Sequence, residues 1–390
     1  MRLAFAVMRV LIDARPAVDT RRTGVGVYTH AMLEHLPPVD PGTRFVAWYL
    51  DLRGIGRPAE RFAGISPNLT EHATRLPIKG FQRLNARIGS PKVEWFAGNA
   101  DVVLATTFVP PPTSIERVVL VVHDLAFDLM PDTAPHVTDR WRRSFDDWLA
   151  RASAVIVPTE ATRADLLRLH RVDPALVHAI HHGVDAEPFT RVSPVDVVDA
   201  KRRFGIEGRY VLSLTGQEKR KNLRGLVLAF ERMSEQRHWL VIAGGRVRWA
   251  PDHSDDVERE IARLPAAARG RIVRTGYVSD DDRRALLSGA EALAYPSRYE
   301  GFGFPVLEGF AARVPVLTSN VSAMPEVAGE AAVLVDPDNV DAIAGGLDRI
   351  LVDEGLREEL RDAGTGRLAS FTWERSARAT AAVLRDALRR

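Results

Sequence analysis

Short apolar runs recur along the chain, and most of them are followed by a segment in which apolar residues return every three or four positions. This alternation is typical of buried strands that each lead into an amphipathic helix. The expected strands are RVLI (9–12), VAWYL (46–50), DVVLAT (101–106), EALAY (291–295) and VPVLTSN (314–320), the apolar starts of the segments 117–131, 152–170, 210–233 and 271–290, the segments VHAIHHGVD (177–185) and WLVIAGG (239–245), and one strand toward the end of 324–339. Strands that alternate with helices predict an α/β protein with parallel sheets.

One stretch interrupts the alternation. Residues 188–209 contain a short charged helix between turn-forming residues, and we expect them to form a linker. The linker separates residues 1–187 from residues 210–372, and each of these halves alternates strand and helix. Because the chain has 390 residues, of which 46% are hydrophobic, it can bury two separate cores. We therefore expect two doubly wound α/β domains.

Composition excludes several classes of protein. The net charge is only +2, which does not suggest a nucleic-acid partner. The chain contains no cysteine, so a disulfide framework, a thiolate metal site and a cysteine nucleophile are excluded, and a reducing cytoplasm is compatible. No apolar stretch reaches the roughly 18 residues that a membrane span needs. Arg9 and Asp13 interrupt the apolar start, which argues against a signal peptide and leaves Met1 and Met8 as alternative starts.

The most informative stretch runs from Tyr295 to Glu308 and reads YPSRYEGFGFPVLE. It follows an expected strand and leads into a segment with helical spacing, in which Pro305 suits the first helical position. A helix N-terminus presents unpaired amides and partial positive charge to an anion, and Gly301 and Gly303 let the backbone approach a ligand closely. Glu300 and Glu308 flank these amides. The pattern indicates a ligand with phosphate in its middle and hydroxyl groups at its ends.

This segment resembles the E-x7-E motif of the retaining glycosyltransferases of family 4, also called group 1. These enzymes have two Rossmann-like domains that face each other across a cleft, the GT-B fold. The resemblance implies that Glu300 contacts the transferred sugar and that Glu308 holds the nucleotide ribose. It also implies that the backbone of Phe302, Gly303 and Phe304 binds the diphosphate of the donor.

The loop after the first strand of the second half is basic. Lys219, Arg220, Lys221 and Asn222 lie between that strand and an amphipathic helix, and they include two of the five lysines in the chain. Cations in this position suit a diphosphate. The run resembles the R-K-N element of family 4, in which the arginine and the lysine, here Arg220 and Lys221, neutralise the leaving nucleotide diphosphate. Some members carry a further arginine six residues before this lysine, where this chain has Thr215.

A histidine follows an apolar strand in the first half. His123 and Asp124 come directly after RVVLVV, at the carboxyl end of a parallel strand, where open sheets bind ligands. A histidine at such a position often has only a structural role, with its ring nitrogens hydrogen-bonded to the backbone. Family 4 enzymes, however, place a His-Asp pair at the corresponding position, and the resemblance implies that His123 contacts the transferred sugar.

Two further turns are candidate binding elements. Gly24 and Gly26 precede an amphipathic helix, and the family carries a similar glycine-rich loop near the donor diphosphate and the acceptor. Tyr277 and Val278 follow a strand of the second half, where the family uses the turn backbone to frame the nucleotide base. The three acids Asp280–Asp282 suit the first turn of a helix better than a metal site, and we expect no essential metal.

The resemblance covers nearly the whole chain and implies the reaction. We expect a hexosyltransferase that uses a nucleotide-diphosphate sugar and retains the anomeric configuration. Similarity to bacterial mannosyltransferases of surface-polysaccharide assembly favours GDP-mannose, with UDP-glucose and dTDP-rhamnose left open. The acceptor, a glycan, lipid-linked or small-molecule hydroxyl, is expected on the N-terminal domain, onto which the last helix, 373–390, is expected to pack. A nucleotide-sugar epimerase or hydrolase on the same scaffold is the alternative.

One segment leaves open whether the protein works at a membrane surface. Residues 76–96 combine basic and aromatic residues with amphipathic spacing. They are expected either to dock on an anionic membrane or to form an ordinary surface helix that covers the sheet. We therefore expect a cytoplasmic protein, with peripheral contact at the inner face of the membrane as an open alternative.

Overall fold

The computed structural model describes residues 7–18, 23–51, 61–62, 64–75, 91–134, 137–245 and 254–390, and for residues 140, 254 and 255 it describes the backbone alone. The segment expected to be amphipathic, 76–96, lies outside the described residues except for 91–96. The chain forms two compact units. Unit 1 comprises Met1–His123, Asp139–Gly183 and Trp373–Arg390, and unit 2 comprises Asp124–Thr138 and Val184–Thr372. Residues 124–138, which the sequence analysis placed in the N-terminal domain, therefore make most of their contacts in unit 2.

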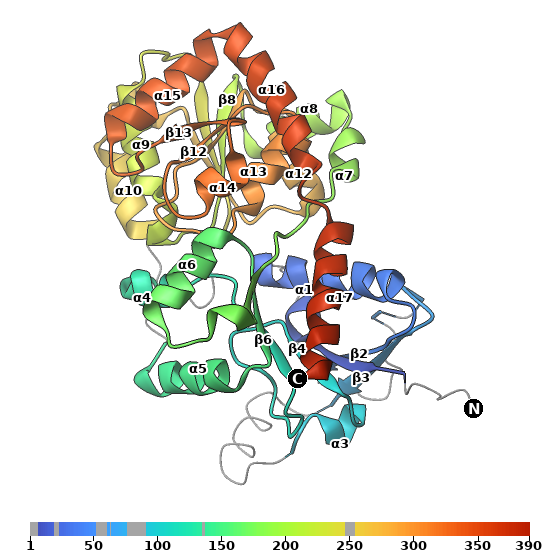
Figure 1. Ribbon diagram of the computed structural model, residues 1–390. Coiled ribbons are helices and arrows are strands. Elements are labelled where there is room, and N and C mark those ends of the chain that lie inside the picture. The colour runs from blue at the N-terminus through green and yellow to red at the C-terminus, as the bar shows by residue number, and fades with distance from the viewer. Residues whose placement is uncertain are drawn as a thin grey trace, which may run out of the picture. The chain divides into compact units, whose positions relative to one another are not determined.

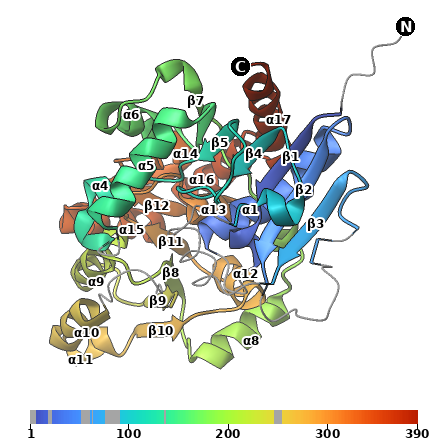
Figure 2. The same ribbon diagram turned by 90° about the horizontal axis from the view of Figure 1, so that it is seen from below.

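Unit 1 is built on a seven-stranded sheet in the order β3-β2-β1-β4-β5-β6-β7, in which every pair is parallel (Figure 2). Its strands are β1 (Arg9–Asp13), β2 (Arg44–Leu50), β3 (Leu69–Thr74), β4 (Val102–Ala105), β5 (Val118–Val121), β6 (Ala154–Val157) and β7 (Val177–Ala179). All residues of β4, β5 and β6 are buried, because helices or the chain cover both faces of a parallel sheet.

The helices of unit 1 come from both ends of the chain. They are α1 (Gly24–Val39), α3 (Glu94–Ala97), α5 (Asp139–Arg151), α6 (Glu160–Leu169) and α17 (Trp373–Arg389), with 3-10 turns η1 (Arg15–Val18) and η4 (Pro174–Leu176). The last helix, α17, lies beside the first, α1, and also contacts β4, β5 and β6 (Figure 1).

Unit 2 is built on a six-stranded parallel sheet in the order β10-β9-β8-β11-β12-β13. Its strands are β8 (Tyr210–Leu214), β9 (Trp239–Ala243), β10 (Ile272–Gly276), β11 (Ala292–Tyr295), β12 (Val316–Ser319) and β13 (Ala332–Val335). Each of the twelve strand regions expected from the sequence contains a strand. The prediction of an α/β protein with two parallel sheets is confirmed.

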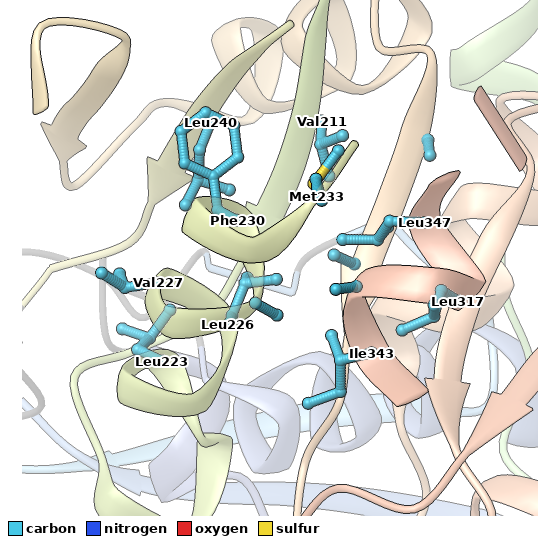
Figure 3. Packing of buried hydrophobic residues seen from close by; sticks show 14 of the residues in the cluster. Val211, Leu223, Leu226, Val227, Phe230, Met233, Leu240, Leu317, Ile343 and Leu347 are labelled. Carbon is cyan, nitrogen blue, oxygen red and sulfur yellow. The ribbon is translucent and has the colours of Figure 1, made fainter. Parts of the chain in front are cut away.

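The other elements of unit 2 are helices and 3-10 turns. They are α4 (Ala126–Leu129), α7 (Glu187–Thr190), α8 (Pro194–Phe204), α9 (Leu223–Arg232), α10 (Ser254–Arg263), α11 (Ala266–Arg269), α12 (Asp280–Ser288), α13 (Phe304–Ala311), α14 (Met324–Ala328), α15 (Val340–Val352) and α16 (Glu354–Leu368), with 3-10 turns η3 (Pro131–Thr133) and η5 (Lys219–Lys221). Figure 3 shows Leu226 and Phe230 of α9 packed with strand residues and with Leu347 of α15. Among the described residues, no helix combines the length and apolar character required to cross a bilayer.

Strand β3 was not predicted. Its sequence, LTEHAT, is polar, and its side chains are mostly half-buried or exposed because it is the edge strand of the sheet. Parallel pairing with β2 along its whole length holds it in place. Two cross-strand hydrogen bonds add to this pairing: Trp48 Nε1 donates to Thr74 Oγ1 (2.8 Å), and Tyr49 Oη donates to Glu71 Oε2 (2.8 Å). Backbone pairing and polar side-chain contacts therefore hold strand β3, and a search for apolar periodicity does not detect such a strand.

In each sheet the strand order reverses at one point. On one side of this point the chain continues toward one edge of the sheet, and on the other side it continues toward the opposite edge. In unit 1 this point lies between β1 and β4, and in unit 2 it lies between β8 and β11. The carboxyl ends of such strands leave a crevice in which open α/β sheets bind ligands. In unit 2, the loop after β8 carries Arg220 and Lys221, and the loop after β11 carries Glu300. Topology thus brings Glu300 to Arg220 and Lys221, which lie 80 and 79 positions earlier in the sequence.

Candidate active site

The basic loop after β8 is held by Asn222. This residue adopts a left-handed conformation (φ 57°), which asparagine tolerates better than most residues. Its side-chain amide donates to the carbonyl oxygens of Pro296 (3.2 Å) and Pro337 (2.7 Å), from the loops after β11 and β13. Asn222 is buried and anchors the turn that presents Arg220 and Lys221. Asn222, the asparagine of the R-K-N run, therefore has a structural role, because it fixes the turn that carries the two cations.

Glu300 lies between the two cations. Arg220 Nη1 donates to Glu300 Oε2 at 2.7 Å, and Lys221 Nζ donates to Glu300 Oε1 at 2.5 Å. Arg220 also pairs with Glu218, with 2.9 Å between Nε and Oε2. The side chains of Arg220, Lys221 and Glu300 are 13%, 12% and 8% exposed, so water screens their charges little. The structure thus brings the basic pair Arg220–Lys221 together with Glu300, which comes from a separate motif.

Tyr295 joins this cluster from the last position of β11. Its hydroxyl accepts from Lys221 Nζ (2.7 Å) and donates to Glu300 Oε1 (2.8 Å). Its carbonyl oxygen accepts from Thr318 Oγ1 on the adjacent strand β12 (2.9 Å), which holds the strand end. The tyrosine was not predicted as a site residue, although it begins the stretch that carries the two glutamates. From the sequence, an aromatic residue at the end of a buried strand is expected to belong to the hydrophobic core. Only the contacts of the Tyr295 hydroxyl group with Lys221 and Glu300 show that it belongs to the ion-pair cluster.

The charges set the protonation of Glu300. Burial by itself would raise the pKa of this carboxyl group, but the nearby charges of Arg220 and Lys221 outweigh burial and lower the pKa to about 2. Burial alone would lower the pKa of Arg220, whereas Glu300 and Glu218 raise it well above its ordinary value. Glu300 is therefore an anion and Arg220 a cation across the physiological pH range. This cluster can stabilise negative charge on a ligand while offering an acceptor for hydroxyl groups.

The helix after Glu300 begins one residue before the start that the sequence predicted. Helix α13 starts at Phe304, and Gly303 caps it with φ 101°, a conformation that glycine adopts readily. A Cβ atom on Gly303 would also lie 2.4 Å from Met324 Cε. Pro305 occupies the second helical position, one residue later than expected. Phe302 is buried, and its ring contacts that of Phe304, with ring centroids 5.1 Å apart.

Glu308 has a cationic partner of its own. It lies one turn inside α13, and its Oε1 atom contacts Nη1 of Arg283, which comes from α12. The two side chains are 16% and 28% exposed. Arg283 was not predicted as a site residue, because its position on α12 resembles that of any surface arginine in an amphipathic helix. Glu300 and Glu308 are thus both held by basic residues from other elements.

Tyr277 and Val278 do not belong to the ion-pair cluster. They follow β10, and Tyr277 is 55% exposed, beside Gly245 in the loop after β9. A Cβ atom on Gly245 would lie 3.3 Å from Tyr277 Cβ, so the two turns are in contact. Ser279 then caps α12 by accepting from the amide of Asp282. The three acids Asp280–Asp282 lie in the first turn of α12, as predicted.

His123 lies at the carboxyl end of the unit 1 sheet. Its Nε2 atom lies 2.9 Å from the carbonyl oxygen of Thr106, so Nε2 carries the proton in this hydrogen bond. Thr106, in turn, donates to the carbonyl oxygen of Asp13 (2.6 Å) across the point where β1 and β4 lead apart. Tyr28 of α1 meets the imidazole edge-on, with ring centroids 5.1 Å apart. His123 is buried and fixed in orientation, as a contact to a bound sugar would require.

The two glycines near residue 25 occupy a different place from that expected. Helix α1 begins at Gly24, and the amide of Val27 donates to the carbonyl oxygen of Thr23 (2.8 Å). Gly24 and Gly26 therefore lie in the first turn of the helix rather than in a loop before it. The prediction of a preceding Gly-x-Gly loop was wrong about the helix boundary, because two glycines are poor helix formers but do not prevent a first turn.

In the part of the chain that the structure describes, no three His, Cys, Asp or Glu side chains come together as a metal site would require. Asp280 and Asp281 pair instead with Arg283 and Arg284 on the same helix.

Sequence families account for nearly the whole chain. Residues 22–188 match the family described as Glycosyltransferase Family 4, and residues 198–367 match the family described as Glycosyl transferases group 1. The chain belongs to glycosyltransferase family 4. The family, the enzyme class and the GT-B fold expected from the sequence are confirmed, and this glycosyltransferase is of the hexosyltransferase class.

Relatives of this glycosyltransferase include named mannosyltransferases. It is 30% identical to the O-antigen chain mannosyltransferase B of Escherichia coli over 67% of this chain and 68% of the relative. It is 29% identical to the MMP alpha-(1->4)-mannosyltransferase of Mycolicibacterium hassiacum over 60% of this chain and 54% of the relative. The serotype-specific mannosyltransferase WbdA of Escherichia coli is 26% identical over 73% of this chain, and the match spans 35% of WbdA.

Solved structures share the fold of this glycosyltransferase. Sucrose-phosphate synthase from Thermosynechococcus elongatus has a TM-score of 0.72 at 19% identity and covers 97% of this chain and 98% of its own. Anabaena HepE in complex with UDP and glucose has a TM-score of 0.73 at 16% identity and covers 97% and 99%. WaaG, a glycosyltransferase involved in lipopolysaccharide biosynthesis, has a TM-score of 0.68 at 14% identity and covers 97% and 99%. At these identities the likeness establishes the GT-B fold alone.

Proposed function

We propose that this glycosyltransferase transfers a hexose from a nucleotide-diphosphate sugar to a hydroxyl group of a glycan, a lipid-linked glycan or a small molecule, with retention of the anomeric configuration. The observation that carries the proposal is the buried cluster at the ligand-binding edge of the unit 2 sheet. There Glu300 lies within 2.7 Å of Arg220 and 2.5 Å of Lys221. A site with two fixed cations and a fixed carboxylate can hold both the phosphate and the sugar of such a donor.

In the proposed reaction, the bond between the anomeric carbon and the phosphate oxygen breaks, and a new bond forms from that carbon to the acceptor oxygen. The acceptor proton passes to a phosphate oxygen of the leaving group, so the products are a glycoside and a nucleoside diphosphate. Negative charge grows on the diphosphate as the bond breaks. Arg220, Lys221 and the amides at the start of α13 stabilise that charge, which is the largest electrostatic demand of the step.

The remaining candidate residues position the donor. Glu300 accepts hydrogen bonds from hydroxyl groups of the transferred sugar, and Glu308 accepts from the ribose. His123 contacts the transferred sugar, and the turn at Tyr277 and Val278 frames the base. Arg220 and Lys221 supply the positive charge, so the step as proposed contains no resident metal ion.

The donor is proposed to be GDP-mannose. Three of the relatives, from two organisms, are named as mannosyltransferases. One related protein is named alpha-maltose-1-phosphate synthase, and HepE was solved with UDP-glucose, so UDP-glucose is the next donor to test. A thermal-shift screen of GDP-, UDP- and dTDP-sugars identifies the donor, because a ligand that binds the folded state at 100 times its Kd stabilises that state by about 2.7 kcal/mol.

Mass spectrometry of products tests the reaction itself. With GDP-mannose and a mannose-containing acceptor, we expect an acceptor heavier by one hexose unit together with GDP, and little hydrolysis without the acceptor. Glu300→Gln and Lys221→Ala should lose transfer while they remain folded. Free sugar or an isomerised donor in the absence of acceptor would favour the epimerase or hydrolase alternative, and full activity in both variants would overturn the site.

A further inference from the structure

The Arg283–Glu308 pair connects two helices that flank the proposed nucleotide site. Arg283 lies one turn inside α12, which begins directly after the Tyr277–Val278 turn. Glu308 lies one turn inside α13, which begins after the Glu300 loop. Arg283 contacts Glu308 through Nη1 and Asp280 through Nη2, the latter at 3.3 Å. The arginine is therefore held on its own helix while it reaches a carboxylate on the next.

The contact leaves one side of the Glu308 carboxylate for a ligand. Arg283 uses Oε1, and no hydrogen bond to Oε2 is found among the described residues. A carboxylate oxygen can accept two hydrogen bonds, which matches two neighbouring hydroxyl groups. Glu308 is 16% exposed, so Oε2 need not give up a full hydration shell when a ligand arrives.

The electrostatics favour the charged form of Arg283. Burial alone would lower the pKa of Arg283, but the charge of Glu308 and the hydrogen bond to it raise the pKa above its ordinary value. A free glutamate side chain loses rotamer entropy when it becomes fixed. Because Arg283 fixes Glu308 before the ligand binds, that loss does not fall on the binding step.

We propose that Arg283 is a positioning residue for nucleotide recognition, which orients Glu308 so that Oε2 accepts hydrogen bonds from the 2′- and 3′-hydroxyl groups of the donor ribose. The inference rests on the proposed function, in which Glu308 binds the ribose. A purely structural pair, by contrast, would join α12 to α13 and change the affinity for every nucleotide equally, with or without these hydroxyl groups.

Paired ligands separate the two roles. The affinities of GDP and of 2′,3′-dideoxy-GDP are measured by calorimetry on the full chain, with UDP and 2′,3′-dideoxy-UDP as a second pair. The variants are Arg283→Met, which keeps the aliphatic stem, and Arg283→Lys, which keeps the charge but loses the planar fork. The matched control is Arg284→Met, because Arg284 is the next residue on α12 and pairs with Asp281.

We expect wild-type protein to bind the ribonucleotide at least tenfold more tightly than its dideoxy analogue. Arg283→Met should remove most of this preference by weakening ribonucleotide binding about tenfold while it leaves the dideoxy analogue nearly unchanged. For Arg283→Lys, the preference for the ribonucleotide should lie between those of wild type and Arg283→Met. For Arg284→Met, the preference should match that of wild type. In turnover, Arg283→Met should raise the donor KM more than it lowers kcat.

The outcomes distinguish the inference from the function beneath it. If wild-type protein binds neither ribonucleotide, the proposed function is overturned. If wild-type protein prefers the ribonucleotide and Arg283→Met keeps that preference, or weakens both ligands equally, the inference alone is overturned. Melting temperatures without ligand show whether each variant is folded.

Discussion

Glu300 shows how one residue depends on its neighbours for its charge. A carboxylate this deeply buried is destabilised unless cations pair with it. Arg220, Lys221 and the hydroxyl group of Tyr295 supply that pairing from three directions. The same cations serve the diphosphate in the proposed reaction, so a bound donor competes with Glu300 for them. Replacing Glu300 therefore removes a sugar contact and strengthens the field that a diphosphate meets.

The lowered pKa of Glu300 predicts a loss of stability in acid. The pKa falls from 4.5 to about 2 on folding, which corresponds to about 3 kcal/mol of stabilisation when the carboxyl group is ionised. Because the folded pKa is depressed, this contribution is complete above the unfolded pKa and disappears as the pH falls from about 4.5 to about 2. Urea unfolding of wild type and Glu300→Gln should show a difference of about 3 kcal/mol at pH 7 that narrows at pH 3.

The control for this prediction is Glu358→Gln. Glu358 is exposed and pairs only with Arg361 among the ion pairs found, so its replacement should change the unfolding free energy by less than about 0.5 kcal/mol. A difference between wild type and Glu300→Gln that stays constant from pH 7 to pH 3 would contradict the assigned charge state of Glu300.

At the scale of the element, the start of α13 depends on one glycine. Gly303 adopts φ 101° and lies against Met324, so the backbone between the two glutamates can turn into the helix only there. Strained φ values cost about 1–3 kcal/mol for a residue with a side chain. The two glutamates of the motif are thus held at their spacing by the turn as well as by the helix.

Gly303→Ala should lower the unfolding free energy by about 2 kcal/mol or more, and it should weaken nucleotide binding because the amides of the turn are displaced. Gly345→Ala is the matched control. Gly345 lies inside α15 with no atom within 4 Å of its added Cβ, so alanine there should stabilise the protein by about 0.5–1 kcal/mol. Thermal melts and nucleotide titrations measure both effects. Equal stability of the two variants would show that the turn does not need glycine.

At the scale of the whole molecule, unit 1 is completed by the end of the chain. Helix α17 packs on α1, which lies more than 330 residues earlier in the sequence, and on three strands of the unit 1 sheet. Arg385 of α17 also pairs with Asp40, which follows α1, at 3.0 Å. Trp373 and Tyr28, from α17 and α1, contribute rings 6.3 Å apart to the aromatic group that surrounds His123. Helix α17 therefore helps to form the surroundings of the candidate site residue His123.

Ala377→Asp tests that contribution. Ala377 is fully buried on α17, and an unpaired carboxylate there should destabilise the protein by about 3 kcal/mol or more. Arg378→Ala, one residue later and 64% exposed, should change stability by less than about 0.5 kcal/mol. Urea unfolding followed by tryptophan fluorescence measures both variants. An unchanged midpoint for Ala377→Asp would mean that α17 packs loosely.

Sequence alone determined the class of fold and the chemical character of the site. Apolar runs located twelve of the thirteen strands in the described part of the chain, because residues buried on both faces of a parallel sheet leave a signal in every position. Edge strand β3 escaped detection because its own residues are mostly polar and only partly buried. The candidate residues Glu300, Glu308, Arg220 and Lys221 were also visible, since their types, their spacing and the glycines among them indicate phosphate and sugar.

Tertiary structure alone decided which of these residues meet. The pairing of Glu300 with Arg220 and Lys221 depends on the adjacency of β8 and β11, which no local pattern encodes. Tyr295 and Arg283 acquired their places in the site only when a hydroxyl group and a guanidinium group came within reach of glutamates on other elements. Periodicity and motifs report what each segment is made of, whereas contacts between distant segments follow from the strand order of the folded sheet.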